Sequence, residues 1–447
     1  MAELKYAKDG HLIFTKEMKK EYKILAPNML PIHFELIRNI FVNEGYDMEL
    51  LQTTGPNIVS EGLQNVHNDT CYPCLLVVGQ FIDALKSGKY DPNKTALIIT
   101  QTGGGCRASN YIHLLRKALH KAGFDQVPVI SLNLSGLEHN SGFKLSLGLL
   151  LKLISALLYG DMLMLLANQI RPYETQPGAA DQNVTKWIGI LAGYYKKSSG
   201  FSMKEMEKTF RAMIEDFAKI PFVRTPKIKV GIVGEIYVKY SPLANNNLEQ
   251  FLFREGAEVI VPGLLDFILF KFDNRLVDID LYGGNPVKYK VVGLLKNYML
   301  RAQKVYIQTL KESGVFDAPA DFETIKKMVK PFIGYGAKMG EGWLLTAEMV
   351  ELVHSGVENV VCAQPFGCLP NHIVGKGMIR KIRNEMPHAN IVAIDYDPGA
   401  TKVNQENRLK LMLATAKDRM QEQEREQKKT RLQVRVKEEK EPIAVHE

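Results

Sequence analysis

A glycine-rich turn between an apolar run and a helical pattern constrains the fold of this chain most. The apolar run covers residues 96–99, the turn covers residues 100–110 with Cys106, and helical spacing follows over residues 111–119. Such a run is typical of a buried parallel strand, and three consecutive glycines let the backbone approach a ligand closely. Cys106 is expected at the start of that helix, where the free N–H groups and the helix dipole favour the thiolate form of its side chain. The turn is therefore predicted to hold an anionic or metallic group at the carboxyl edge of a sheet.

Two further cysteine turns have a similar layout. Cys71 and Cys74 flank a Tyr-Pro pair ahead of an apolar helical pattern. Because proline suits the first turn of a helix, Cys71 is predicted at or just before the helix start. Residues 360–372 run from an apolar strand through a loop with Cys362 and Cys368 to a helix. All five cysteines of the chain lie in these three turns.

Strand and helix patterns alternate on both sides of a long helical stretch, which predicts doubly wound parallel sheets. Ligands of such sheets bind beyond the carboxyl ends of the strands. Within the helical stretch, residues 145–158 and 162–170 are predicted to form a buried helical hairpin. The predicted segments are a polar lead-in (1–20), an α/β domain (21–142), a helical insertion or lid (143–221), a second α/β region (222–423) and a charged, disordered tail (424–447).

Composition narrows the class of protein. The chain is 46% hydrophobic and 24% charged, which is ordinary for a soluble globular protein. The net charge of +8 is mild for 447 residues and no aromatic-basic module occurs, so we expect no nucleic-acid partner. Lys152 and Asp161 interrupt the most apolar segment, so we expect no membrane span. No secretory signal is visible, and the expected location is cytoplasmic, where unpaired thiols are typical of metal ligands or catalytic groups.

The cysteine pattern alone leaves several kinds of site open. The pair Cys71 and Cys74 fits two structural thiols or a redox pair. The glycine turn lacks the lysine of a phosphate-binding loop and the spacing of a dinucleotide-binding motif. Zinc normally takes two close ligand pairs, whereas Cys362 and Cys368 are loosely spaced. Iron–sulfur clusters accept thiolates from distant loops. A metal or cluster site and a set of structural thiols therefore both remain possible.

Three motifs of the chain resemble those of the 2-hydroxyacyl-CoA dehydratase family. They are residues 71–73, 102–111 and 364–372, in the family's order. Residues 390–399 resemble the branch whose members occur fused to, or beside, an acyl-CoA dehydratase activase, and the similarity covers roughly residues 20–415. The resemblance implies an α/β fold of repeated flavodoxin- or Rossmann-like doubly wound parallel sheets with the helical insertion. It also implies an oxygen-sensitive [4Fe-4S] cluster.

The resemblance further implies a lyase that dehydrates an acyl-CoA by radical chemistry after one-electron activation. The chain has no Gly-x-x-x-x-Gly-Lys-Ser/Thr loop, so the electron is expected from a separate ATP-hydrolysing iron–sulfur activase. One alternative is an ATP-driven reductase with a double-cubane cluster. Two such cubanes need six thiolates and the chain has five, so they would have to be shared across a dimer or use another ligand. A homo- or heterodimer is the expected assembly. Another alternative is a non-catalytic cluster-binding or electron-relay subunit.

The candidate site residues lie in the three cysteine turns. Cys71, Cys106 and Cys368 are the preferred metal ligands, because each is predicted in a loop at a helix start. Cys74 and Cys362 are further candidate ligands, or buried thiols. The remaining candidates are Arg107, Ser109 and His372 as catalytic groups and Gly103, Gly104, Gly105 and Asn110 as residues that contact the cofactor. The plainer interpretation is that the polar members of this set only cap helices.

Overall fold

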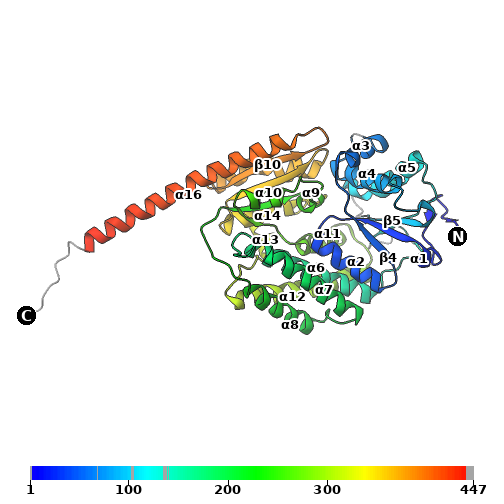
Figure 1. Cartoon of the computed structure of the whole chain (residues 1–447), viewed down its shortest axis with the longest axis horizontal. Coiled ribbons are helices and arrows are strands. Elements are labelled where there is room, and N and C mark those ends of the chain that lie inside the picture. The colour runs from blue at the N-terminus through cyan, green and yellow to red at the C-terminus, as the bar shows by residue number, and fades with distance from the viewer. Residues whose placement is uncertain (1–2, 68, 102–104, 134–137, 139, 439–447) are drawn as a thin grey trace, which may run out of the picture.

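Two four-stranded parallel sheets with the same strand order form the framework of the protein (Figure 1). The computed structural model describes residues 3–438 except 68, 102–104, 134–137 and 139. The sheet orders are β4-β3-β5-β6 and β8-β7-β9-β10. Counted within each sheet, both orders are 2-1-3-4, as in flavodoxin-like folds, so the predicted α/β fold class is confirmed. The strands are β3 (Lys23–Pro27), β4 (Asp47–Leu51), β5 (Thr95–Thr100), β6 (Val129–Leu132), β7 (Lys229–Gly234), β8 (Glu258–Ile260), β9 (Asn359–Pro365) and β10 (Asn390–Tyr396), after a short antiparallel pair, β1 (Lys5–Tyr6) and β2 (Leu12–Ile13).

Helices cover the faces of both sheets, and the sheets share a core. A continuous cluster of buried apolar side chains includes Leu97 of β5, Leu75 of the helix after Cys71, and Val361 of β9. These strands are apolar almost throughout, as expected for parallel strands that are buried on both faces. The helices around the sheets are α1 (Met18–Glu21), α2 (Pro31–Asn43), α3 (Pro56–Asn65), α4 (Tyr72–Lys86), α5 (Tyr111–Ala122), α9 (Ile236–Tyr240), α10 (Leu248–Arg254), α14 (Trp343–His354) and α15 (Ile379–Glu385).

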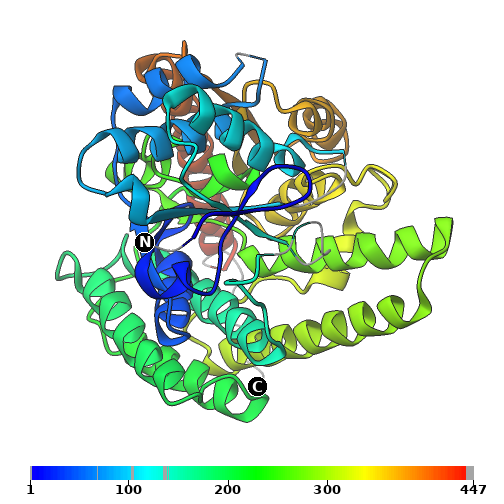
Figure 2. The same cartoon turned by 90° about the vertical axis from the view of Figure 1, so that its right-hand side faces the viewer.

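A separate layer of helices lies on one side of the sheets, in the lower half of Figure 1. Its members are α6 (Leu147–Ile170), α7 (Ala179–Lys196), α8 (Met203–Ala218), α11 (Leu264–Tyr282), α12 (Pro286–Ser313) and α13 (Phe322–Val329). The first three occupy the range of the expected insertion, whereas the last three come from the region expected to be α/β. Figure 2 shows α11 and α12, in yellow-green, as an antiparallel arm that extends beyond the neighbouring helices.

The expected helical hairpin at residues 145–170 is wrong, because these residues contain a single helix, α6, from Leu147 to Ile170. Gly160 and Asp161, which look like a helix break in the sequence, lie inside the helix and make contacts with other elements. A Cβ at Gly160 would lie 2.4 Å from the ring of His33, so glycine lets α2 approach closely. Asp161 accepts a hydrogen bond from His33 (2.7 Å) and another from the amide of Leu264 (2.8 Å).

The helix α6 is also the one described helix that is long and apolar enough to cross a membrane, judged by length and composition. Inside the protein, 72% of its most apolar window is buried. It packs against α2, α7, α8, α11 and α12. These contacts are those of a core helix in a compact α/β protein.

The last helix, α16 (Lys402–Glu438), first packs on β10 and then projects from the body of the protein (Figure 1). Its packed part buries Leu409, Met412 and Leu413. The sequence predicted a disordered tail from residue 424, whereas the structure continues the helix to Glu438. Good helix formers and the absence of glycine and proline over residues 402–441 account for this difference.

Candidate cysteine centre

Two of the three cysteine turns follow the central strands of the two sheets. Cys106 follows β5 and Cys368 follows β9. Each of these strands lies beside the first strand of its sheet, where the direction of strand addition reverses. Ligands of doubly wound sheets bind at such points. Cys71 is the residue that immediately precedes α4, and the proline of its motif lies in the first turn of that helix, as the sequence predicted.

Backbone contacts hold the Cys71 turn against the Cys368 turn. The amide N–H of Tyr72 donates a hydrogen bond of 3.0 Å to the carbonyl oxygen of Phe366. At Gly367, which has a positive φ of 75°, a Cβ would lie 3.1 Å from the Cα of Cys71. Glycine is therefore required both by the backbone conformation and by the close approach of the two turns.

A loop over residues 339–341 connects the Cys106 turn with the Cys368 turn. A Cβ at Gly105 would lie 2.8 Å from Sδ of Met339. A Cβ at Gly340 would lie 3.2 Å from Cγ of Pro370 and 4.0 Å from Sγ of Cys106. The amino group of Lys271 donates to the carbonyl oxygen of Gly340. Two of the three cysteine turns therefore meet at one loop that contains no cysteine, and the Cys71 turn joins them through the Cys368 turn.

The thiols of Cys71 and Cys368 each contact a polar side chain. Sγ of Cys71 lies 2.7 Å from the hydroxyl of Tyr111, and the amide of Asn371 donates to Sγ of Cys368 at 3.4 Å. Burial raises the pKa of the Cys71 thiol to about 12, although the Tyr111 hydroxyl acts in the opposite direction. Burial also raises the pKa of Cys106 and of Cys368. The thiols are thus neutral unless a metal displaces their protons.

The cysteine turns can be compared with the ligand sets of a single metal ion and of an iron–sulfur cluster. Among the described residues, no three His, Cys, Asp or Glu side chains lie close enough together to hold one metal ion. A single zinc ion, with Zn–S bonds of about 2.3 Å, draws its thiolates into close contact. A cubane of four irons and four sulfides is larger and takes its thiolates from separate loops. Cys71, Cys106 and Cys368 lie in three separate turns, and the Cys106 and Cys368 turns both contact residues 339–341.

The other two cysteines differ in their surroundings. Cys74 is fully buried in the first turn of α4, and its amide donates to the carbonyl oxygen of Cys71 (3.0 Å). Cys362 is fully buried inside β9 and belongs to a different apolar cluster, with Val233 and Val360. Burial raises the pKa of Cys362 to about 12, and its charged neighbours are not those of the other thiols. Cys362 thus belongs to a different apolar cluster from Cys71 and Cys74. A Cβ at Gly375 would lie 3.3 Å from Sγ of Cys362 and 3.6 Å from Oδ1 of Asn371, so Cys362 lies near the turn that contacts Cys368.

The candidates that follow Cys106 form a local turn. The hydroxyl of Ser109 donates to the carbonyl oxygen of Cys106 (2.5 Å). The backbone N–H of Asn110 donates to the carbonyl oxygen of Arg107 (2.8 Å). The side chains of Arg107 and Asn110 are exposed. Gly103 and Gly104 lie outside the described residues, whereas Gly105 lies against Met339.

His372 lies in a π-helical turn, η3 (Asn371–Gly375), directly after Cys368. Its amide donates to the carbonyl oxygen of Cys368 (3.2 Å), and its side chain is half-buried. The neighbouring Asn371, not His372, contacts the thiol of Cys368. The carbonyl oxygen of the Asn371 side chain is buried without a hydrogen-bond partner among the described residues. The side chain that contacts the thiol of Cys368 therefore also holds a buried oxygen atom without a hydrogen-bond partner among the described residues.

Sequence reasoning missed two carboxylates beside the cysteine turns, those of Glu235 and Glu341. Glu235 directly precedes α9, and its Oε2 accepts a hydrogen bond from the amide of Val238 (2.9 Å). Oε1 of Glu341 accepts one from the amide of Ile236 (3.1 Å). The sequence alone could have pointed to Glu235, because this residue follows β7 at the carboxyl edge of the second sheet, where ligands bind. Glu341 lies in a loop with no such signal.

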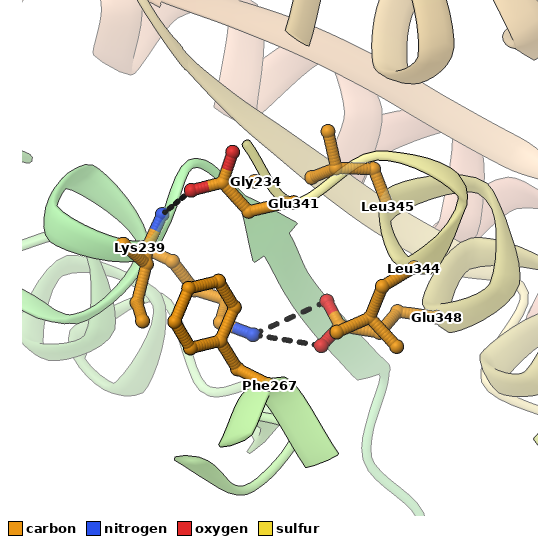
Figure 3. A pocket seen from close by; sticks show the side chains of 8 residues that line it. Gly234, Lys239, Phe267, Glu341, Leu344, Leu345 and Glu348 are labelled. Carbon is orange, nitrogen blue, oxygen red and sulfur yellow. Dashed lines mark hydrogen bonds and ion pairs between the residues drawn. The ribbon is translucent and has the colours of Figure 1, made fainter. Parts of the chain in front are cut away.

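A small pocket, with room for no more than a water molecule, lies beside Glu341 (Figure 3). It is lined by Gly234, Ile236, Lys239, Phe267, Glu341, Leu344, Leu345 and Glu348. The amino group of Lys239 forms an ion pair of 2.9 Å with Glu348, and both side chains are only 4% exposed. Figure 3 shows Glu341 on the opposite wall, bound to backbone at one oxygen only. The cavity thus combines apolar walls with a buried ion pair and the carboxyl group of Glu341.

Comparison with known proteins adds no family to this geometry. No protein-family model and no curated protein matches the chain. The function has to be inferred from the three cysteine turns and their surroundings.

Proposed function

We propose that the chain is an iron–sulfur enzyme of the 2-hydroxyacyl-CoA dehydratase type, in which Cys71, Cys106 and Cys368 hold a [4Fe-4S] cluster. One observation carries the proposal: the Cys71 turn contacts the Cys368 turn directly, and the loop at residues 339–341 links the Cys106 turn to the Cys368 turn, although the three turns are distant in sequence. The motifs in these turns resemble the family's motifs, which supports the same assignment.

When bound, the cluster would supply a one-electron centre with one iron open to a substrate oxygen. The residues of the chain would orient the ligands and exclude water. Tyr111 and Asn371 fix the side chains of Cys71 and Cys368 through their hydrogen bonds. The thiols of Cys71 and Cys368 are buried, and Cys106 is partly exposed, which leaves an approach to the site from its side. Exclusion of solvent is what radical chemistry on an acyl-CoA requires.

The proposed electron donor is a separate ATP-hydrolysing activase, and the surface at the cysteine turns supports a docking partner there. Met339, Phe366, Leu369 and Ile373 are 53%, 53%, 68% and 57% exposed. Exposed apolar side chains that lie this close together on adjacent turns are typical of protein interfaces. Electron transfer requires a donor near the cluster, so the occupant that we infer for this surface is the activase.

The arm formed by α11 and α12 supports the proposed dimer, with a second copy of the chain as the partner. Leu281, Val287 and Leu294 near its tip are 66%, 67% and 69% exposed. The arm also has charged residues near its tip, such as Asp280 on α11 and Lys290 on α12. Two arms related by a two-fold axis would bury these exposed apolar side chains against each other. We further propose that the protein is cytoplasmic.

A double cubane within one chain is less well supported. Such a cluster needs six thiolates from two sets of three, and the chain has five cysteines. An electron-relay subunit without a substrate remains the competing function. Substrate turnover separates it from the dehydratase.

The proposed function predicts turnover only with an activase and ATP. The reconstituted protein would be incubated under anaerobic conditions with 2-hydroxyacyl-CoA substrates and a chemical reductant. One set of reactions would contain an activase and ATP, and the matched set would contain the activase without ATP. We expect enoyl-CoA only in the first set, because an unactivated acyl group needs an electron of lower potential than soluble carriers supply. Equal rates in the two sets, or no turnover of any substrate, would contradict the proposal.

A further inference from the structure

Lys271 of α11 reaches the loop that links two of the cysteine turns. Its amino group donates a hydrogen bond to the carbonyl oxygen of Gly340. A Cβ at Gly340 would lie 4.0 Å from Sγ of Cys106 and 3.2 Å from Cγ of Pro370, in the Cys368 turn. A single residue of the loop therefore contacts the amino group of Lys271 as well as both cysteine turns.

Two aromatic rings of α11 hold the side chain of Lys271 in this position. The amino group lies 4.9 Å from the ring centroid of Phe267 and 5.2 Å from that of Phe270. A cation at these distances is attracted to the face of an aromatic ring. Phe270 is fully buried and packs edge-on against Trp343, with 5.1 Å between the ring centroids. The hydrogen bond and the rings together fix where the positive charge lies.

The charge of Lys271 has no counter-ion in direct contact. Lys271 forms no ion pair with any residue that the structure describes, whereas Lys338, in the segment before the loop, is paired with Asp278. The charged groups that face Lys271 are the carboxyl of Glu341 and the thiol of Cys106. Removing a cation from water without an anion in contact is costly. An anion held at the cysteine turns would therefore be stabilised by Lys271.

The electrostatic influence between Lys271 and Cys106 acts in both directions. Burial lowers the pKa of Lys271, while Glu341 and Cys106 act against this effect. Burial raises the pKa of Cys106, and Lys271 is a cation that acts against that rise. Each group thus lies within electrostatic reach of the other, in agreement with the contacts through Gly340.

We propose that Lys271 is a positioning residue of the cysteine centre, whose ammonium group holds the loop at Gly340 and supplies positive charge beside the ligand Cys106. This inference rests on the proposed iron–sulfur function. A [4Fe-4S] core with three thiolates is negatively charged, and its reduction by one electron adds a negative charge. The ammonium group therefore favours the reduced state and raises the reduction potential of the centre. The electron comes from the activase, and Lys271 keeps its proton.

Three variants separate the charge of Lys271 from its hydrogen bond. Lys271→Arg keeps the charge and a donor, Lys271→Gln keeps a donor without the charge, and Lys271→Met keeps neither. Each reconstituted protein would be analysed for iron and sulfide and then titrated with reductant under EPR detection. We expect Lys271→Gln and Lys271→Met to shift the equilibrium about tenfold toward the oxidised cluster, a potential about 59 mV lower for a one-electron couple. Lys271→Arg should remain close to the wild type.

Lys304→Met is the matched control for net charge. Lys304 is an exposed lysine of α12, so this variant loses the same charge from the helical layer of the protein. Water and salt screen an exposed charge, and we expect the potential of the wild type. A potential that falls equally in Lys304→Met and Lys271→Met would overturn the inference.

Hydrogen exchange of the cluster-free protein tests the hold on the loop independently. The backbone N–H of Gly342 donates to the carbonyl oxygen of Met339 (2.9 Å), which closes the turn around Gly340. We expect this turn to exchange about tenfold faster in Lys271→Met than in the wild type, because a hydrogen bond from a charged donor is lost.

Two results would overturn the inference: equal potentials in the wild type, Lys271→Gln and Lys271→Met, or equal exchange of the turn in the wild type and Lys271→Met. Where Lys271→Met binds no cluster, the comparison of Lys271→Gln with Lys271→Arg decides the role of the charge. A wild-type protein without iron and sulfide would instead contradict the proposed function, and hydrogen exchange would still decide whether Lys271 holds the loop.

Discussion

At the scale of single residues, burial decides which ionisable groups carry a charge. Around the cysteine centre it keeps the thiols and Glu235 protonated, whereas Lys239 and Glu348 neutralise each other. The protonation state of each group follows from its neighbours, because a buried group is charged only where an opposite charge compensates the cost of desolvation. The same rule applies to Asp266 in the helical layer, far from the cysteines in sequence.

Asp266 gives a prediction for the pH dependence of stability. Burial raises the pKa of this carboxyl to about 8, although Gln303 donates to it at 2.7 Å. A raised pKa means that the folded state binds the proton more tightly than the unfolded state. The free energy of unfolding should therefore fall as pH rises from about 4 to about 8, by up to about 1.4 kcal/mol per pH unit, and then stay level.

Asp266→Asn tests this contribution, because asparagine keeps an acceptor for Gln303 and cannot ionise. We expect the variant to lose less stability than the wild type between about pH 5 and pH 8, measured by thermal unfolding. An identical pH dependence in the two proteins would show that Asp266 is ionised in the folded state.

At the scale of elements, close approach between helices depends on single glycines. Gly160→Ala should place a methyl group against the ring of His33 on α2. We expect a loss of about 1–3 kcal/mol in the free energy of unfolding, as for other overpacked cores. The measurement is denaturant unfolding of the two proteins side by side.

Gly189→Ala is the matched control for this change. Gly189 lies in α7, and a Cβ there would have no neighbour within 4 Å. Alanine in an open helical position stabilises by about 0.5–1 kcal/mol. A similar stability of Gly160→Ala and Gly189→Ala would contradict the account of the contact between α2 and α6.

Elements were predictable from sequence where the signal is local. The apolar strand β5, the position of Cys71 before α4 and the alternation of strands and helices all follow from neighbouring residues. The continuous helix α6 was missed because Gly160 and Asp161 look like a break, and their partner His33 is distant in the chain. Glu341 was missed for the same reason, since only the folded chain places it beside α9.

At the scale of the whole molecule, the two flavodoxin-like sheets have the same strand order. In each sheet the direction of strand addition reverses beside the first strand, and the turns at these two points lie near the loop at residues 339–341. The Cys106 turn comes from the first sheet, and the Cys368 turn comes from the second. A site assembled between two sheets lies at a boundary, which is where cofactor sites commonly occur. The sequence predicted the edge of each sheet but not that the two edges meet, because no local pattern encodes the packing of one sheet against the other.

The central claim is that Cys71, Cys106 and Cys368 hold an iron–sulfur cluster. The most direct measurement is iron and acid-labile sulfide content with EPR spectroscopy, after anaerobic reconstitution of the wild type and of single Cys→Ser variants. We expect about four irons and four sulfides per chain in the wild type. The clusters should be lost in Cys71→Ser, Cys106→Ser and Cys368→Ser and kept in Cys362→Ser. A wild-type protein without iron and sulfide, or a cluster lost in Cys362→Ser but kept in Cys71→Ser, would contradict the account.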